Sequence, residues 1–305
     1  MNRKTKQLLT RVAGLILAAA LALPINQYIT TENEEDVFEQ TYSTGVIEVH
    51  LIDVGQGDSI LIEAEDHAML IDAGENNKGS IVTDYLKSQD IKSLDYVIGT
   101  HPHSDHIGGL DTVLDSFPTN KVILPKVTHT TKTFEDVLDA IERKNLKITQ
   151  PIVGDQYQLG PASFTIVAPN SSEYDDLNDY SVGIKLTYGN NSFLFTGDAT
   201  DMSEKEMLES GIDLSSNVLK LGHHGSSTSS TEEFLNAVNP SYVMISVGKD
   251  NEYRHPHVEV MRRLKERDIK VYRSDVQGSV VFTSDGKNIS VNTKNYEITQ
   301  DDIQK

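Results

Sequence analysis

The chain has 305 residues and a formal net charge of −19, with 46 acidic against 27 basic side chains, and it contains no cysteine. This length predicts one large domain or two small ones. The lack of cysteine excludes disulfides, thiolate metal ligands and a thiol nucleophile, so any metal must be held by nitrogen and oxygen atoms. The acidic balance counts against tight nucleic-acid binding, which depends on neutralising phosphates.

The first 23 residues have the layout of an export signal. Four basic side chains between residues 3 and 11 precede an apolar run over 12–23, with small residues suited to cleavage after Ala20 or Ala22. An uncleaved membrane anchor is the alternative, although the run is shorter than the ~20 residues that a spanning helix prefers. A buried first helix is the third interpretation. Residues 24–44 are rich in acids, which predicts a flexible tether.

The remaining elements are predicted in chain order from hydrophobic periodicity and turn signals. Strands at 46–53, 59–63 and 69–72 form a β-meander, followed by a helix over 81–88, a buried strand at 96–99 and a helix over 110–117. A strand at 121–124, a helix over 134–143, a strand at 163–168 and a hairpin of strands 182–188 and 192–196 come next. The hairpin is predicted to turn at Gly189, Asn190 and Asn191.

The last third repeats this mixture of strands and helices. Helices are predicted over 201–210, 231–238 and 257–267, and strands at 218–221, 242–247, near 271 and at 279–282. Each half begins with strands and then alternates them with helices. The pattern predicts one two-layered domain over 45–295, with sheets inside and helices outside, and a C-terminal tail over 296–305.

The loop after the strand at 96–99 carries the densest chemical signal in the chain. His101, His103, Asp105 and His106 fall within six positions, and a glycine pair follows them. Neutral imidazole and ionised carboxylate are ligands that zinc and manganese accept. The sequence therefore predicts a metal site at this loop.

Other acids and histidines also follow predicted strands. Asp72 follows the strand at 69–72, Asp198 follows the hairpin, and His223 with His224 follows the strand at 218–221. Loops at strand ends gather catalytic residues on a rigid scaffold. Any one of these acids could be only a turn former or a helix cap. Together with the histidine loop they favour one metal-binding constellation.

Three further polar groups have two interpretations each. His255 is either a turn residue before Pro256 or a group that contacts a phosphate oxygen or protonates a leaving group. Residues 226–228 (Ser-Ser-Thr) either donate hydrogen bonds to a phosphate or cap the next helix. Asp58 ends a glycine-rich turn over 53–58, for which we favour a structural role over a place near the metals.

These motifs resemble a metallo-β-lactamase-fold hydrolase, and more narrowly the hydrolase domain of ComEC-type DNA-uptake competence proteins. Residues 101–106 match the main metal motif of the fold, and 53–59 match the opening turn of the ComEC branch. Residues 196–199, 219–227 and 251–256 match later motifs. The resemblance covers about 46–282. It implies an α/β (α+β) fold, an αββα sandwich of two mixed sheets with outer helices and a two-metal centre at one rim.

The resemblance also assigns roles by position. It implies two divalent ions, Zn²⁺ or Mn²⁺, the first held by His101 and His103, the second by Asp105 and His106, with Asp198 bridging them. One of His223 and His224 would complete the second site, and the choice between them stays open. Asp72 would orient a ligand histidine through a hydrogen bond. The catalytic residues are then Asp105, Asp198, His224 and His255.

Many relatives use one more histidine between the metal loop and the bridging aspartate. Residues 178–181 (Asn-Asp-Tyr-Ser) contain none, and His129 stands on a predicted loop. The first metal would therefore be weakly held, take extra water or use Asp179. The missing histidine also argues against β-lactamase or glyoxalase activity.

The predicted function is an exported, metal-dependent hydrolase that cleaves phosphodiester bonds through a metal-bridging hydroxide, with DNA as the preferred substrate. The alternative is the same chemistry on a nucleotide or a cell-wall-linked phosphodiester, as in phosphorylcholine esterases. A non-catalytic metal-binding protein is the third hypothesis, and the intact Asp105, His106 and Asp198 argue against it. We expect an extracellular or cell-surface protein whose only membrane contact is its N-terminal segment, with the oligomeric state open.

Overall fold

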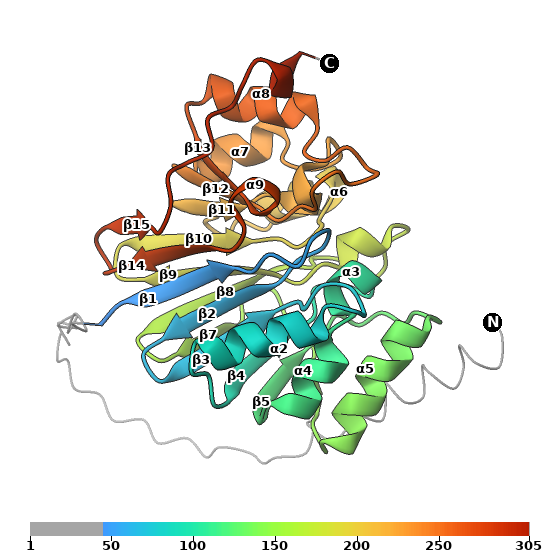
Figure 1. Cartoon of the computed structure of the whole chain (residues 1–305). Coiled ribbons are helices and arrows are strands. Elements are labelled where there is room, and N and C mark those ends of the chain that lie inside the picture. The colour runs from blue at the N-terminus through green and yellow to red at the C-terminus, as the bar shows by residue number, and fades with distance from the viewer. Residues whose placement is uncertain (1–44, 305) are drawn as a thin grey trace, which may run out of the picture.

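The computed structural model describes residues 45–304, so the predicted export signal and tether lie outside the described residues. Two mixed β-sheets face each other, and helices cover both outer faces (Figure 1). This arrangement confirms the predicted αββα sandwich. No helix within residues 45–304 is long and apolar enough to cross a membrane.

The first sheet has eight strands in the order β15-β14-β1-β2-β3-β4-β5-β6. Strands β1 to β3 and their β14 and β15 neighbours pair antiparallel, and β3 to β6 pair parallel. The predicted meander therefore opens this sheet. The strands are β1 (Ile47–Leu51), β2 (Ile60–Ala64), β3 (His67–Ile71), β4 (Leu94–Ile98), β5 (Thr119–Ile123), β6 (Ile148–Thr149), β14 (Val280–Ser284) and β15 (Ile289–Val291).

The second sheet has seven strands in the order β13-β12-β11-β10-β9-β8-β7. Strands β7 to β10 pair antiparallel and β10 to β13 pair parallel, so it repeats the plan of the first sheet. Asn191 pairs with Tyr188, so the β9–β10 turn consists of Gly189 and Asn190 and is shorter than predicted. The strands are β7 (Gln156–Leu159), β8 (Ala162–Ala168), β9 (Gly183–Tyr188), β10 (Asn191–Phe195), β11 (Val218–Lys220), β12 (Tyr242–Ile245) and β13 (Lys270–Arg273).

Helices α2, α4 and α5 cover the first sheet, and α6, α7 and α8 cover the second (Figure 1). One apolar core lies between the sheets, and one lies under each helical layer. The helices are α2 (Gly79–Ser88), α3 (Ser104–Ile107), α4 (Leu110–Ser116), α5 (Lys132–Arg143), α6 (Asp201–Glu209), α7 (Glu232–Val238), α8 (Val258–Glu266) and α9 (Ser274–Gln277). Within residues 45–304, the 3-10 turns are η1 (Leu177–Tyr180), η2 (Gly222–Gly225) and η3 (Asp301–Ile303).

The segment predicted as a C-terminal tail makes contacts with the domain. Tyr296 forms a β-bridge with Val271, and its hydroxyl donates to Asp302 at 2.8 Å. Arg262 of α8 donates to the carbonyl of Ile303 at 3.0 Å. The described part of this segment, up to residue 304, therefore packs against α8 and β13.

The loops that follow β3, β4, β10, β11 and β12 carry the predicted site residues. The parallel parts of both sheets contribute these strands. Parallel strands end at the same edge, which is where open α/β sheets bind their ligands. The sheet topology therefore gathers side chains that are far apart in the sequence.

Candidate metal centre

Unusual backbone conformations mark two of the loops at this edge. Asp72, directly after β3, has a φ of 58°. His223 and His224 follow β11 as consecutive residues with φ of 49° and 55°, between two glycines. Left-handed conformations are unfavourable for residues other than glycine and concentrate at functional sites. The fold therefore holds these three side chains in positions that an ordinary turn would not give.

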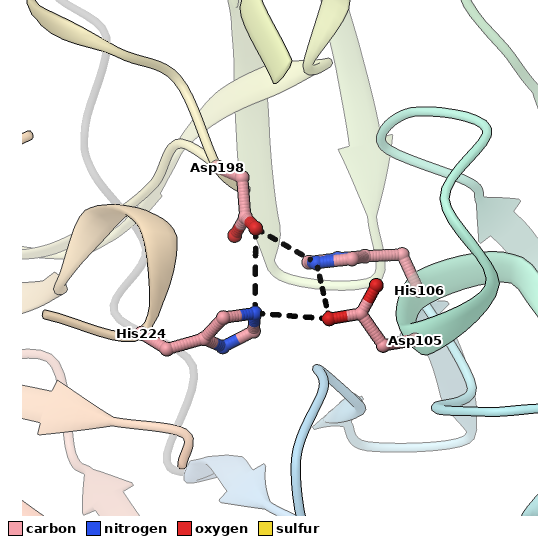
Figure 2. A group of neighbouring side chains, drawn as sticks. All are labelled: Asp105, His106, Asp198 and His224. Atoms are coloured by element: carbon pink, nitrogen blue, oxygen red, sulfur yellow. Dashed lines mark ion pairs between the residues drawn. The ribbon is translucent and has the colours of Figure 1, made fainter. Parts of the chain in front are cut away.

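Four side chains meet at the centre of the edge (Figure 2): Asp105, His106, Asp198 and His224. Their ligand atoms all lie within 4.8 Å of one another. Asp198 Oδ2 is 3.1 Å from His106 Nε2 and 3.3 Å from His224 Nε2. Asp105 Oδ2 is 3.3 Å from His224 Nε2 and 3.8 Å from His106 Nε2.

The four residues fit a divalent cation. Carboxylate oxygens of Asp105 and Asp198 lie close to both imidazoles. Three ligand atoms are nevertheless buried without a hydrogen bond, namely His106 Nε2, His224 Nε2 and Asp198 Oδ1. Two ligands each ~2.0–2.2 Å from a shared ion, at tetrahedral or octahedral angles, are themselves about 3–3.5 Å apart. The observed separations match ligands converging on an ion better than donors facing acceptors.

Hydrogen bonds on the far side of both imidazoles fix their orientation. Asp72 accepts from His106 Nδ1 at 2.8 Å and is itself held by the backbone N–H and hydroxyl of Thr100. His224 Nδ1 donates to the carbonyl of Ser246 at 2.9 Å. Both rings therefore present Nε2 to the cluster, and Asp72 has the geometry of the orienting residue that the resemblance implied.

The carboxylates dominate the electrostatics of the cluster. Burial lowers the pKa of His106, but Asp198, Asp105 and Asp72 outweigh it and raise this pKa well above its usual value. Burial likewise lowers the pKa of His224, and Asp198 with Asp105 raises it well above its usual value. The metal-free cluster therefore balances its carboxylates with protons on the imidazoles, and a divalent ion would take their place.

Two charged residues beside the cluster, Lys220 and Asp58, lie outside the predicted set of site residues. Lys220 at the end of β11 is fully buried, forms an ion pair with Asp58 and donates to the carbonyl of Gly197 at 3.2 Å. Asp58 Oδ1 also lies 3.3 Å from His224 Nδ1. Asp58 therefore does more than form a turn. The signal for Lys220 was present: a lysine stands inside a strand that is otherwise apolar and buried.

Opposite charge keeps both members of this pair ionised. Burial raises the pKa of Asp58, but Lys220 and the histidines hold it below its usual value. Burial lowers the pKa of Lys220, but Asp58 and Asp198 raise it above its usual value. A fixed positive charge consequently lies beside Asp198, whose Oδ1 is 3.8 Å from Lys220 Nζ.

His101 and His103 form a pair beside the cluster. Their rings face each other, with His101 Nε2 2.9 Å from His103 Nδ1. The other nitrogen of His101 lies 3.0 Å from the Thr100 hydroxyl and 3.3 Å from that of Ser181. The Thr100 hydroxyl donates to Asp72, so it accepts from His101 Nδ1 and leaves His101 Nε2 as an acceptor or ligand atom. The 2.9 Å separation from His103 Nδ1 is close to that of two ligands on one ion, so His101 and His103 stay candidate ligands of the first metal.

Neither residue considered for the missing ligand reaches the cluster. Asp179 Oδ1 accepts from the backbone N–H and hydroxyl of Thr200, at 3.0 and 2.7 Å, so it supports the start of α6. His129 bonds the Thr131 hydroxyl instead. The Ser181 hydroxyl accepts from the Asp198 backbone N–H at 3.0 Å and lies 3.3 Å from His101 Nδ1, so it joins the two parts of the site.

The cluster opens into a cavity of about 320 Å³. His255 lines it with a buried Nδ1 that makes no hydrogen bond, and burial together with His224 lowers the pKa of His255 to about 3. His223 also lines it, with Nε2 3.8 Å from Asp198 Oδ2 and Nδ1 beside the Thr228 hydroxyl. The other lining residues are Gln56, Glu75, His103, Ser104, Asp105, Asn178, Asp198, His224 and Tyr253.

The geometry distinguishes the paired candidates. His224 points into the cluster with both carboxylates in reach, whereas His223 lies at its mouth, 25% exposed. Residues 226–228 do not line the cavity: Thr228 contacts Ser226 and His223, and Ser227 contacts His257. Tyr253, 56% exposed, stacks on His255 with ring centroids 5.6 Å apart.

Comparison with known proteins agrees with this geometry. Residues 52–249 match the family model of the metallo-beta-lactamase superfamily. The chain belongs to this superfamily. The metallo-beta-lactamase fold protein YhfI of Bacillus subtilis shares the fold, with a TM-score of 0.52 at 14% identity over 79% of this chain and all of that chain. Membership of this superfamily supports a metal-dependent hydrolase in general, and the cluster supplies ligands for a divalent ion.

Two relatives show which group within the superfamily this chain resembles most specifically. The chain is 31% identical to ComE operon protein 3 of Bacillus subtilis over 77% of its length, and 30% identical to Competence protein ComA of Neisseria gonorrhoeae over 75%. These matches confirm the resemblance to ComEC-type competence proteins. The chain spans 33% and 31% of the lengths of these two proteins.

Proposed function

We propose that the chain is an exported, metal-dependent phosphodiesterase with DNA as its main substrate. The observation that carries the proposal is the buried cluster of Asp105, His106, Asp198 and His224, whose unpaired ligand atoms face an open polar cavity. Bound divalent cations, zinc or manganese, would activate water and neutralise charge on the phosphate oxygens there. This chemistry needs no side-chain nucleophile.

The surrounding residues bind and orient the substrate in this proposal. At neutral pH His255 is uncharged because its pKa is about 3, so it can donate one N–H to a phosphate oxygen. His223 at the mouth of the cavity is the second donor, and burial lowers its pKa as well. The exposed ring of Tyr253 offers a surface on which a base can stack.

DNA is favoured over other phosphodiesters by the competence relatives, one of which is named for competence and the other for the ComE operon. The net charge of −19 favours the second candidate, a nucleotide or a cell-wall-linked phosphodiester, because a strongly acidic surface repels a polyanion. Export rests on the layout of the first 23 residues.

The test is hydrolysis by the purified chain loaded with Mn²⁺ or Zn²⁺. Single-stranded DNA, double-stranded DNA and bis(p-nitrophenyl) phosphate are the substrates, with Asp198→Asn as the control that removes the bridging charge. DNA cleavage that is lost in Asp198→Asn supports the nuclease. Cleavage of the small ester alone favours the second candidate. Hydrolysis of neither, with metal bound, contradicts the proposal.

A further inference from the structure

Another group of ligand-type side chains lies on the first sheet and shares no residue with the candidate metal centre. Glu48 and His50 are two residues apart on β1, and Glu63 lies directly opposite Glu48 on the antiparallel strand β2. The intervening Val49 belongs to the core between the sheets. Side chains alternate along a strand, so the three groups face away from that core, and His50 contacts Tyr85 of α2.

This arrangement is unfavourable without a cation. Like charges directly opposite each other on paired strands destabilise a sheet. His50 is 1% exposed, and its Nε2 lies 3.1 Å from Glu63 Oε1 and 3.7 Å from Glu48 Oε2. Both His50 Nε2 and Glu63 Oε1 are nevertheless buried without a hydrogen bond, so the ring N–H axis does not point at the carboxylate.

The same pattern occurs in the candidate metal centre. There too, imidazole Nε2 atoms lie 3.1 to 3.8 Å from carboxylate oxygens and make no hydrogen bond. The other nitrogen of His50 is 3.1 Å from the Tyr85 hydroxyl of α2, which orients the ring as a metal-binding histidine is commonly oriented. Burial and the two glutamates raise the pKa of Tyr85, so its hydroxyl stays protonated at neutral pH.

We propose that Glu48, His50 and Glu63 form a separate site for a borderline divalent cation such as Zn²⁺ or Mn²⁺. One imidazole and two carboxylates are a ligand set that these ions accept, and open positions are filled by water. Glu48 and Glu63 are 40% and 22% exposed, which gives an ion access from solvent. The bound ion joins β1 to β2 and removes the repulsion between the glutamates.

The experiment counts metal equivalents on the full chain after equilibration with a fixed free concentration of Zn²⁺. Wild type, Glu63→Gln and His50→Gln are compared, and Co²⁺ absorption reports the ligand environment. Glu63→Gln and His50→Gln should each bind one metal equivalent fewer than wild type. Each should also lose the part of the metal-dependent rise in Tm that this site supplies. Hydrolysis at the catalytic centre, where wild type shows it, should be unchanged. Asp198→Ala should still bind the metal equivalent of this second site. The metal count therefore tests the second site even if the proposed hydrolysis is not observed.

His67→Gln is the matched control, because His67 pairs with Asp95 alone at 3.0 Å and should retain every equivalent. Tyr85→Phe should weaken the site about 10- to 100-fold. Glu63→Gln keeps the side-chain size and exposure, so it remains informative if His50→Gln fails to fold.

The Tm of the metal-free proteins distinguishes a metal site from the alternative, in which a protonated histidine bridges the two carboxylates. Loss of repulsion should raise the Tm of metal-free Glu63→Gln, whereas loss of an imidazolium partner would lower it. A lower Tm, or equal metal equivalents in wild type and Glu63→Gln, would overturn the proposal.

Discussion

Lys220 and Asp58 form an ion pair that is fully buried beside the candidate metal cluster, at 1% and 2% side-chain exposure. The pair joins the end of β11 to the turn between β1 and β2, and both members contact cluster residues: Lys220 lies near Asp198, and Asp58 near His224. It therefore links the two sheets at the point where the site is assembled.

Breaking this pair should destabilise the protein strongly. Lys220→Met leaves Asp58 buried without its counter-charge, which costs about 3–5 kcal/mol of unfolding free energy. Urea unfolding of the metal-free protein measures the effect. The double variant Lys220→Met with Asp58→Asn should recover much of the loss, because no isolated charge remains. Additive losses in the double variant would show that the two residues act independently.

Asp72→Asn should weaken metal binding without removing a ligand. The amide cannot hold His106 in the orientation that the carboxylate imposes at 2.8 Å, so affinity should fall about 10- to 100-fold. Competition with a chromophoric chelator measures the affinity. Asp95→Asn, which changes a histidine–aspartate pair outside the cluster, is the control. Equal losses in both variants would point to a general effect on folding.

Metal binding should release protons. The pKa values of His106 and His224 are raised well above the usual value by the surrounding carboxylates, so both rings carry protons near neutral pH in the metal-free protein. A metal must displace those protons, and its affinity should therefore rise with pH. Calorimetric titration in buffers of different ionisation enthalpy measures the release. A binding enthalpy independent of buffer would contradict this account.

Glu204 should make stability depend on pH. Burial raises the pKa of Glu204 from 4.5 to about 7, although the backbone N–H groups of Ser230 and Thr231 favour its charged form. The folded state binds the Glu204 proton more tightly than the unfolded state does. Protonation of Glu204 therefore adds to the free energy of unfolding below about pH 4.5, and this contribution is lost as pH rises to about 7. The shift corresponds to about 3 kcal/mol.

Unfolding by urea between pH 4 and 8 measures this contribution as the difference between wild type and Glu204→Gln. The difference should change across that window, because glutamine does not titrate. Glu209→Gln, an exposed position on the same helix, is the control and should track wild type. A constant difference between wild type and Glu204→Gln would show that Glu204 does not titrate there.

The sequence by itself indicated the sandwich and most of its strands. Strand β1 alternates core residues with His50 and Glu48, and β10 contains the apolar run 193–195 (Phe-Leu-Phe), so both were predicted within a few residues. The short strands β6, β7 and β15 were not predicted, because each has at most four residues and is partly exposed at a sheet edge. Such strands exist through their pairing partners and carry little local signal.

For the site, the sequence determined which residue types stand at the strand ends, because ligand chemistry and spacing are local properties. These residues are the histidine loop, Asp72, Asp198 and the His223–His224 pair. Only the tertiary structure decided that His224 faces the carboxylates, that His101 faces His103, and that Lys220 reaches Asp58. The reason is physical. The contacts of His224 and Lys220 depend on left-handed turns and on the packing of two sheets, which bring together residues up to 162 positions apart, and no local pattern encodes that register.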